Sequence, residues 1–343
     1  MAMYAFAFGS FAADLLVGTS GTWLREALSI GIIVMFTGIN LMGVRKSGES
    51  QDVLVYAKVA ILLLFGVVGL WAIFIDHRAQ PFVGGLFSKG LFAPIVSIGA
   101  IFVSFEGFQL LSYEYTDIEG GLNTMEKGIY LSIAISTVIY VLVAFVTTTI
   151  LSPEEIRQSK ETVLAVAASM LFTDPLIQRI AFVLVAIAAL FSTTSAINAT
   201  LFGTARLTHK VANADVLPQV FSFRNKNGVP TWSLIIIAGL TTVFTALGTL
   251  EEITSFASIA FALVFGTVNY ICLRDSEIDR SPVIPGIGLV GTLAFLPLIL
   301  WHYLRTQPAM LYSVGGIFLA LVILEVGYSE RRRLELLSFR LRN

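Results

Sequence analysis

A carboxylate next to a glycine in the middle of an apolar segment constrains this fold more than any other feature of the sequence. The segment Ile101–Tyr113 reads IFVSFEGFQLLSY and contains Glu106 followed at once by Gly107. No other residue from Phe92 to Tyr113 is charged. Because glycine weakens a helix, the pattern predicts one long apolar span that is broken near its middle. Lipid cannot hydrogen-bond a freed backbone, so such a break is tolerated only where it lines a cavity within protein.

Glu106 itself has two interpretations. A carboxylate at membrane depth is costly and by default marks a substrate or ion pathway. Secondary transporters build their midplane sites from such discontinuous helices. The alternative is a simple glycine kink at which Glu106 snorkels to the interface or is protonated against a neighbouring group.

The composition predicts an integral membrane protein. Apolar residues make up 56% of the 343 positions and charged residues 13%, whereas soluble proteins carry about a quarter charged residues. A helix needs ~20 mostly apolar residues to cross ~30 Å of hydrocarbon. We therefore expect an all-α fold of about ten transmembrane helices, one of them broken, at residues 91–116. The other apolar stretches are Met1–Ala13, Ala27–Val44, Val59–Ile75, Gly128–Ser152, Ile180–Ala205, Val229–Leu250, Ile253–Leu273, Ser281–Leu304 and Thr306–Leu324.

The sequence offers little for other classes of function. Its single cysteine, Cys272, lies in an apolar stretch, so neither a disulfide nor a thiolate metal site is expected. No metal-ligand spacing, phosphate-binding loop, nucleophile elbow or HExxH motif is present. No basic patch with interleaved aromatic residues suggests nucleic acid binding. We therefore expect no enzyme activity, no cofactor and no bound metal.

The two ends of the chain carry different signals. Met1–Ala13 would form about 20 Å of helix, which is too short to cross a bilayer, so we expect the chain to begin inside a transmembrane helix. The tail at residues 329–343 reads as a short basic amphipathic helix that contacts membrane lipids. If Arg45 and Lys46 are placed in the cytoplasm, the cytoplasmic loops hold most of the lysine and arginine residues, and the carboxyl terminus is cytoplasmic.

Three stretches carry a resemblance to a known family. FVSFEGFQLLSYEYTDIE followed by GIYLSI resembles the sixth helix and the next loop of the amino acid–polyamine–organocation (APC) permeases. STTSAINATLFGTARLTHKVANADVLPQVF followed by NGVP resembles their eighth helix and the loop after it. INLMGVRKSGESQDVLVYAKVAILLLFG resembles their fourth and fifth helices.

The resemblance implies an inverted-repeat fold of five plus five helices, followed by two further helices. On that template the chain keeps helices three to twelve and is shortened at its amino end. Residues 1–75 would be the remainder of the first repeat, and residues 91–273 the second repeat. Residues 281–328 would be the two additional helices, and residues 329–343 the cytoplasmic tail.

The resemblance also implies the binding residues. The substrate would lie at the helix break, where backbone carbonyls bind its amino group and aromatic rings contact its side chain. The expected substrate-binding residues are Ser104, Phe105, Glu106, Gly107 and Phe108. Glu106 would either select a cationic or amine-bearing substrate or carry a proton.

Lys58 is the second candidate because it opens the apolar run that starts at Val59. One interpretation is a lysine that snorkels to the interface. The other, implied by proton-coupled members of the family, is an ammonium group in the place that a sodium ion fills in related transporters. Matching polar groups would come from the eighth helix, at Ser192, Ser195 and Asn198. Serine and threonine side chains in spans also serve packing and back-bonding, so only part of this cluster is expected to face a site.

Together these features predict a multi-pass protein of the cytoplasmic membrane that transports amino acids or related amines by proton-coupled symport, with alternating access around a midplane site. One alternative is an exchanger that swaps an amino acid for its amine product. The other is a truncated remnant or accessory membrane subunit that inserts into the membrane but does not transport.

Overall fold

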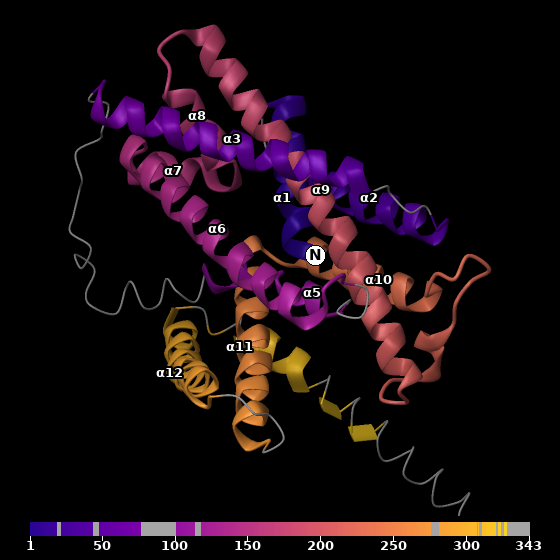
Figure 1. Cartoon of the computed structure of the whole chain (residues 1–343). Helices are drawn as coiled ribbons and strands as arrows, with labels where there is room; N and C mark the ends of the chain where they lie inside the picture. Colours follow the sequence, from indigo (N-terminus) through magenta and orange to yellow (C-terminus); the bar gives the residue numbers. More distant parts are fainter. Residues whose placement is uncertain are drawn as a thin grey trace, which may run out of the picture. The chain divides into compact units, whose positions relative to one another are not determined.

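The protein is helical throughout its described parts. The computed structural model describes residues 1–18, 22–43, 48–76, 101–113, 118–275, 281–306, 308, 311–319, 322–323 and 326–327. Every regular element among these residues is a helix (Figure 1). The α-helices are α1 (Ala2–Val17), α2 (Thr22–Leu41), α3 (Gly48–Phe74), α5 (Gln109–Tyr113), α6 (Gly121–Ile150), α7 (Pro153–Ser159), α8 (Val163–Met170), α9 (Pro175–Asn213), α10 (Thr231–Leu247), α11 (Leu250–Arg274) and α12 (Val283–Thr306). Short 3₁₀ helices are η1 (Val103–Phe105), η3 (Lys160–Thr162) and η4 (Gln219–Ser222).

Six of the described helices are long and apolar enough to cross a membrane, namely α2, α3, α6, α9, α11 and α12. Two shorter apolar helices, α1 and α10, have 16 and 17 residues. Each of the eight lies where the sequence predicted an apolar span. The ends differ, because charge-free stretches and helical hydrogen bonding do not have the same limits. The apolar span expected at residues 306–324 lies partly outside the described residues, and so does the first part of the broken span. The division of the chain into two five-helix repeats stays a prediction.

α3 and α9 show the largest differences from the predicted spans. α3 begins at Gly48, so Lys58 lies well inside the helix rather than at its start. α9 has 39 residues, or about 58 Å at 1.5 Å per residue, which is nearly twice the ~30 Å hydrocarbon thickness. The start of α9 is fixed by Asp174, whose carboxylate accepts hydrogen bonds from the backbone N–H groups of Leu176 (2.8 Å) and Ile177 (3.1 Å).

The chain forms two compact units. The first comprises Met1–Gly85 with Phe105–Leu250, and the second Leu86–Ser104 with Glu251–Asn343. In the first unit α9 packs against α1, α2, α3, α8 and α10 (Figure 1). One core of this unit centres on Ile33, Ile197 and Leu234, from α2, α9 and α10. The other is built where α3, α6, α8 and α9 meet. α9 is therefore the element around which the first unit is assembled.

α3 and α6 approach each other closely at two glycines of α3. A Cβ atom at Gly66 would lie 2.2 Å from Leu142 Cδ2, and one at Gly69 would lie 2.2 Å from Val146 Cγ1. Side chains of α6 thus occupy the space that any larger residue at these α3 positions would need. Such close approach through small residues is typical of helix packing in membranes.

The second unit contains α11 and α12. Its core centres on Ile259, Ile299 and Val314. Ser255 of α11 and Tyr303 of α12 share a buried hydrogen bond of 2.5 Å. The Phe102 ring lies against the Phe295 ring at 5.5 Å between centroids.

The loop between α9 and α10 ties these helices to the end of α2. The Asn225 side-chain amide donates to the Leu41 carbonyl at 3.0 Å, and the Asn227 amide donates to the Met42 carbonyl at 3.2 Å. Asn225 Oδ1 also accepts from the backbone N–H groups of Asn227 (2.9 Å) and Val229 (3.0 Å), which shapes the loop. The last carbonyls of a helix have no partner within the helix, so these amides satisfy groups that would otherwise need water.

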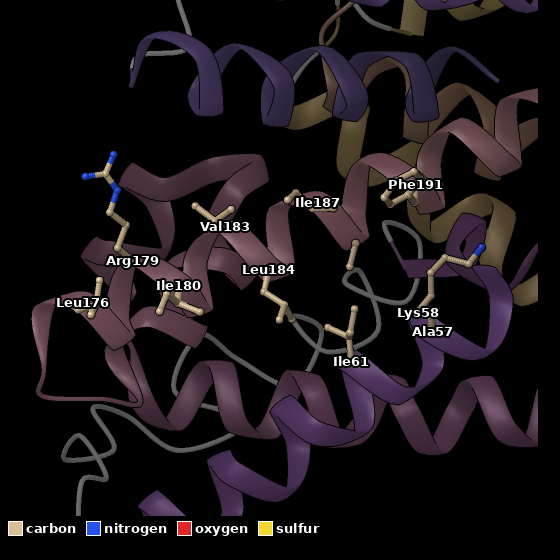
Figure 2. A pocket seen from close by; sticks show the side chains of 11 residues that line it. Ala57, Lys58, Ile61, Leu176, Arg179, Ile180, Val183, Leu184, Ile187 and Phe191 are labelled. Carbon is tan, nitrogen blue, oxygen red and sulfur yellow. The ribbon is translucent and has the colours of Figure 1, made fainter. Parts of the chain in front are cut away.

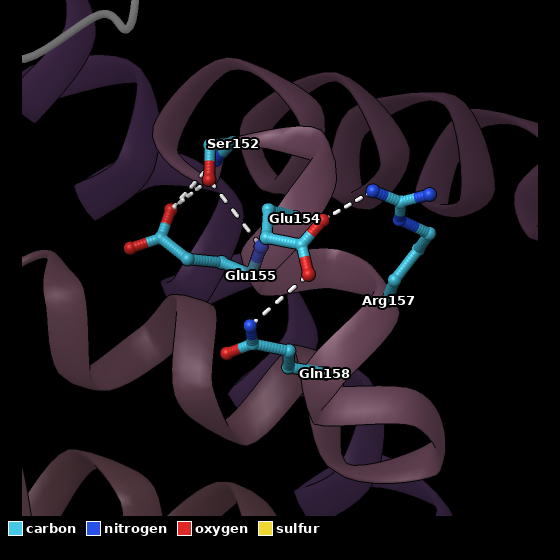
Figure 3. Close-up of polar contacts among 5 residues, drawn as sticks. All are labelled: Ser152, Glu154, Glu155, Arg157 and Gln158. Atoms are coloured by element: carbon cyan, nitrogen blue, oxygen red, sulfur yellow. Dashed lines mark hydrogen bonds and ion pairs between the residues drawn. The ribbon is translucent and has the colours of Figure 1, made fainter.

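Two short helices, α7 and α8, connect α6 to α9. α8 buries Ala165, Ala167 and Ala168 and packs on α9 and α6. α7 begins with a capping box (Figure 3): the Ser152 hydroxyl accepts from the Glu155 N–H, and the Ser152 N–H donates to Glu155 Oε2 at 2.8 Å. The hydrogen bonds from the Ser152 hydroxyl and N–H lower the pKa of Glu155.

The capping box predicts a pH-dependent start of α7. Ser152→Ala should speed amide hydrogen exchange in the first turn of α7 about fivefold near pH 7, because losing an N-cap costs about 1 kcal/mol. The pKa of Glu155 is lowered in the folded state, so the cap is fully present above the unfolded pKa of about 4.3 and is lost as the pH falls through the folded pKa. Exchange measured by mass spectrometry at pH 7 and at acid pH checks this. Glu161→Gln, in η3 beyond the end of α7, is the control; an equal effect of both variants would contradict the assignment.

The hydrogen bonds between this loop and the end of α2 predict that replacing one asparagine destabilises the folded protein. Asn225→Ala removes a donor to the Leu41 carbonyl and two acceptor contacts in the loop. The unpaired groups should cost about 1–3 kcal/mol, seen as a lower melting temperature in detergent. Lys226→Ala changes an exposed neighbour and should leave the melting temperature unchanged. Equal melting temperatures for both variants would show that the amide does not stabilise the fold.

Candidate functional site

The predicted helix break is present at the expected residues. Ile101 and Phe102 are helical, η1 follows at Val103–Phe105, a turn covers residues 106–108, and α5 begins at Gln109. Residues 91–100 and 114–116 of the predicted span lie outside the described residues. The chain passes from the second compact unit to the first between Ser104 and Phe105. The break is therefore also the point at which this segment leaves one unit and enters the other.

The turn depends on Gly107 and Gln109. Gly107 has φ 132°, a backbone conformation that glycine adopts readily and other residues do not. Its N–H, which no helical carbonyl accepts, donates to the Gln109 side-chain oxygen at 2.7 Å. The helix then restarts, with the Leu110 N–H donating to the Gly107 carbonyl at 3.0 Å. A side chain thus replaces the helical partner that the break removes, as the surrounding lipid requires.

Glu106 is the polar group that the turn leaves without a partner. Its Oε1 atom is buried and accepts no hydrogen bond from any residue in the described part of the chain. The Tyr4 phenol of α1 lies within electrostatic range of the Glu106 carboxylate. Next to it, the Phe105 ring meets the Tyr140 ring of α6 edge to face, at 5.3 Å between centroids. A buried carboxylate without a donor can accept either a proton or a cationic group.

The other residues predicted at the break differ in their exposure and in the compact unit to which they belong. Phe108 is half-buried, like Glu106 and Gly107, and the Ser104 side chain is exposed. Ser104 belongs to the second unit, whereas Phe105 to Phe108 belong to the first.

The polar residues of α9 divide into two groups. The Thr193 and Thr194 hydroxyls donate to carbonyls of their own helix, at Ala189 (2.9 Å) and Leu190 (2.5 Å). These two residues are therefore back-bonding groups. Ser192 and Ser195 are half-buried, and their hydroxyls make no hydrogen bond within the described ranges.

Asn198 is already engaged by another helix. Its side-chain oxygen accepts a 2.8 Å hydrogen bond from the Asn40 amide of α2, which also donates to the Phe36 carbonyl at 2.8 Å. Asn40 is buried. This interhelical bond fixes the position of Asn198 and satisfies its acceptor, so the residue is at least partly structural.

Lys58 lies in an open groove between α3 and α9 (Figure 2). The groove has a volume of about 580 Å³, and Figure 2 shows Lys58 at one end and Arg179 at the other. Lys58 is half-buried and makes no ion pair or hydrogen bond with the described residues. Phe191 of α9, which directly precedes Ser192, also lines the groove. The other lining residues are Ala57, Ile61, Leu176, Ile180, Val183, Leu184, Ile187 and Ala188.

Sequence reasoning did not find Tyr4, Tyr140 or Asn40. Asn40 carried a usable signal, since a side-chain amide in an apolar span is costly and needs a partner. Tyr4 and Tyr140 carried none, because tyrosines are common in spans and only tertiary structure shows that they lie near the break. Within the described ranges, no three His, Cys, Asp or Glu side chains lie close enough together to hold a metal ion.

Comparison with known proteins gives the family. The family model described as amino acid permease matches residues 1–323. The inner membrane transport protein YbaT of Escherichia coli K12 is 29% identical over 333 aligned residues, covering 94% of this chain and 73% of that protein. The methylthioribose transporter of Bacillus subtilis is 26% identical, covering 82% of this chain and 63% of that protein. The mouse b(0,+)-type amino acid transporter 1 is 24% identical, covering 89% and 64%.

The fold and these matches define a multi-pass membrane protein of the permease class. The chain belongs to the amino acid permease family, within the APC superfamily that the sequence motifs resemble. The expected shortening at the amino end stays a prediction.

The turn predicts a specific cost at Gly107. A Cβ there would meet no atom within 4 Å, so Gly107→Ala adds no clash and tests the backbone conformation alone. Holding alanine at φ 132° should cost about 1–3 kcal/mol and lower the melting temperature in detergent. Gly31→Ala, in the helical part of α2 with the same open space, is the control and should be neutral or stabilising. If Gly107→Ala were as stable as Gly31→Ala, the turn would not need glycine.

Proposed function

We propose that the protein is a secondary active transporter that moves amino acids across the cytoplasmic membrane in symport with protons, by alternating access around a site at mid-membrane. The observation that carries this proposal is the buried Oε1 atom of Glu106 at a helix break, which accepts no hydrogen bond from the described residues. Membership of the amino acid permease family supports amino acids as the substrate class. The name of the mouse relative, an amino acid transporter, points the same way.

In this proposal the break binds the substrate. Backbone carbonyls freed between Phe105 and Phe108 accept from the substrate amino group, and the rings of Phe105 and Phe108 contact its side chain. Gly107 keeps the backbone accessible because it has no side chain, and Ser104 contributes a hydroxyl. The turn observed at residues 106–108 and the position of Phe105 beside Tyr140 are consistent with these roles.

Lys58 is the proposed coupling group. It lies inside α3 and beside α9, and it has no ion-pair partner among the described residues. We propose that its ammonium group takes the place of a coupling cation and that its gain and loss of a proton drive the cycle. Ser192 and Ser195 would face it at some stage, with Asn198 held nearby on α9 through Asn40.

The proposed orientation places the carboxyl terminus in the cytoplasm. The excess of lysine and arginine in the loops assigned to that side supports it. The basic tail at residues 329–343 would then contact anionic lipids of the inner leaflet.

Proton coupling predicts transport without sodium and a specific effect of Lys58→Ala. In proteoliposomes free of sodium, a gradient of one pH unit is worth about 1.4 kcal/mol per proton and should raise accumulation of a labelled amino acid by up to about tenfold. Lys58→Ala should abolish this response and leave the melting temperature near that of the wild type, because removing a half-buried charge spares its desolvation cost. Lys226→Ala, an exposed loop lysine, should respond like the wild type.

Results of this uptake assay that differ from those expected would each contradict one part of the proposal. A strict sodium requirement, or a Lys58→Ala variant that still follows the pH gradient, removes Lys58 from the mechanism. Uptake that needs an amine or amino acid inside the vesicles identifies an exchanger. Absence of uptake for every amino acid tested contradicts transport itself.

A further inference from the structure

His209 is a buried histidine that the proposed transport cycle does not use. It lies near the end of α9, and only 4% of the residue is exposed. Arg224, an exposed residue of the loop between α9 and α10, donates a hydrogen bond from its Nε–H to His209 Nε2 at 2.7 Å. The side-chain nitrogen of Asn213 lies 2.9 Å from the same ring atom. Two donor groups therefore converge on one nitrogen of the ring.

This arrangement requires a neutral imidazole ring. A guanidinium group has no acceptor and keeps its charge in proteins, so Nε2 of His209 must accept with a lone pair. The single proton of the neutral ring then lies on Nδ1, which is buried as well. A second proton would place an N–H on Nε2 that points at the donors of Arg224 and Asn213, and it would set two positive charges side by side. Protonation of His209 and its hydrogen bond with Arg224 therefore exclude each other.

Arg224 is the charged group that faces this ring. η4 and α10, which pack against α9, contain no charged residue. On α9 itself the nearest charged residues in the sequence are Arg206 and Lys210, which are also positive. Asp215, just beyond α9, accepts a hydrogen bond from the Gln219 side chain at 2.5 Å. No ion pair joins the ring to the described charged side chains of the other helices packed on α9, which are Asp14, Arg25, Glu26 and Lys58.

The residues on either side of Arg224 hold the same loop to two other helices. Asn225, the next residue, donates to the Leu41 carbonyl at the end of α2 at 3.0 Å. The Phe221 carbonyl accepts from the Ser233 hydroxyl of α10 at 2.9 Å. The bond between Arg224 and the histidine ring therefore fixes to α9 a loop that is also bonded to α2 and α10.

We propose that His209 and Arg224 form a pH-sensitive latch, in which the neutral ring holds the loop against α9 and protonation of the ring releases the loop. The bond is present above the ordinary histidine pKa of about 6.5 and is lost as the pH falls. In the proposed orientation this loop lies on the cytoplasmic side, so the latch would respond to the cytoplasmic pH. The inference does not depend on the substrate or on Lys58.

The test is hydrogen exchange of the purified protein in detergent, measured by mass spectrometry at about pH 8 and about pH 5. Each rate is divided by that of an unfolded reference at the same pH. In the wild type, protection of residues 225–229 should fall about tenfold at the lower pH, as expected for losing one hydrogen bond to a charged group. Arg224→Ala should show the low protection at both pH values.

Matched variants identify the titrating group. His209→Gln offers an amide oxygen that accepts from Arg224 and does not titrate, so it should keep the protection at both pH values. His302→Gln changes a histidine of α12 and should respond to pH like the wild type. Melting temperatures at about pH 8 show whether each variant folds. Because Arg224 is exposed, Arg224→Ala tests the latch even if His209→Gln does not fold.

Three results would overturn the latch. Unchanged protection of residues 225–229 in the wild type at the lower pH would show that the loop is not released. The same loss of protection in His209→Gln would assign it to another group. Wild-type protection in Arg224→Ala at the higher pH would show that the bond does not hold the loop. None of these results bears on amino acid transport, which the uptake assay tests separately.

Discussion

The absence of water from the hydrocarbon core is the constraint on which the rest of this structure depends. Every backbone group placed there needs a partner within the protein, so the described spans are helical. The same need appears at the exceptions. At the helix break, Gln109 accepts from the N–H of Gly107. At the end of α2, amides from a distant loop donate to the last carbonyls. In both places a side chain supplies the hydrogen-bond partner that the helix does not.

This constraint separates structural polar groups from functional ones. Thr193 and Thr194 bond their own helix, and Asn40 bonds Asn198 across two helices, so the polar atoms in these bonds are satisfied within the fold. Glu106 differs because one of its carboxylate oxygens is buried and accepts nothing from the described residues. All of these residues are polar groups in apolar surroundings, and only their partners distinguish them. The break is a candidate binding site because this buried acceptor, without a donor among the described residues, lies at an interrupted helix; Thr147, His209 and Ser258 also have buried polar atoms without such a partner but lie within continuous helices.

The positions of the helices could be predicted from the sequence, whereas the contacts between side chains of different helices could not. The reason is physical. Runs of apolar residues reflect the thickness of the membrane, so α2, α6 and α11 lie where expected. The break was predictable because glycine and a charge interrupt such a run locally. Helix ends follow hydrogen bonding instead, so Lys58 falls inside α3. The contact between Phe105 and Tyr140 could not be predicted, because it depends on how distant helices pack.

The amide tie at the end of α2 has a consequence for biosynthesis. The carbonyls of Leu41 and Met42 receive their donors from residues 184 and 185 positions later in the chain. At about 5–20 residues per second, a ribosome makes those donors roughly 10–40 s after the carbonyls. Throughout that interval the end of α2 must be hydrated or held by other groups. The first helices therefore reach their final hydrogen bonding only after α9 has been synthesised, which makes the assembly of this unit a late event in translation.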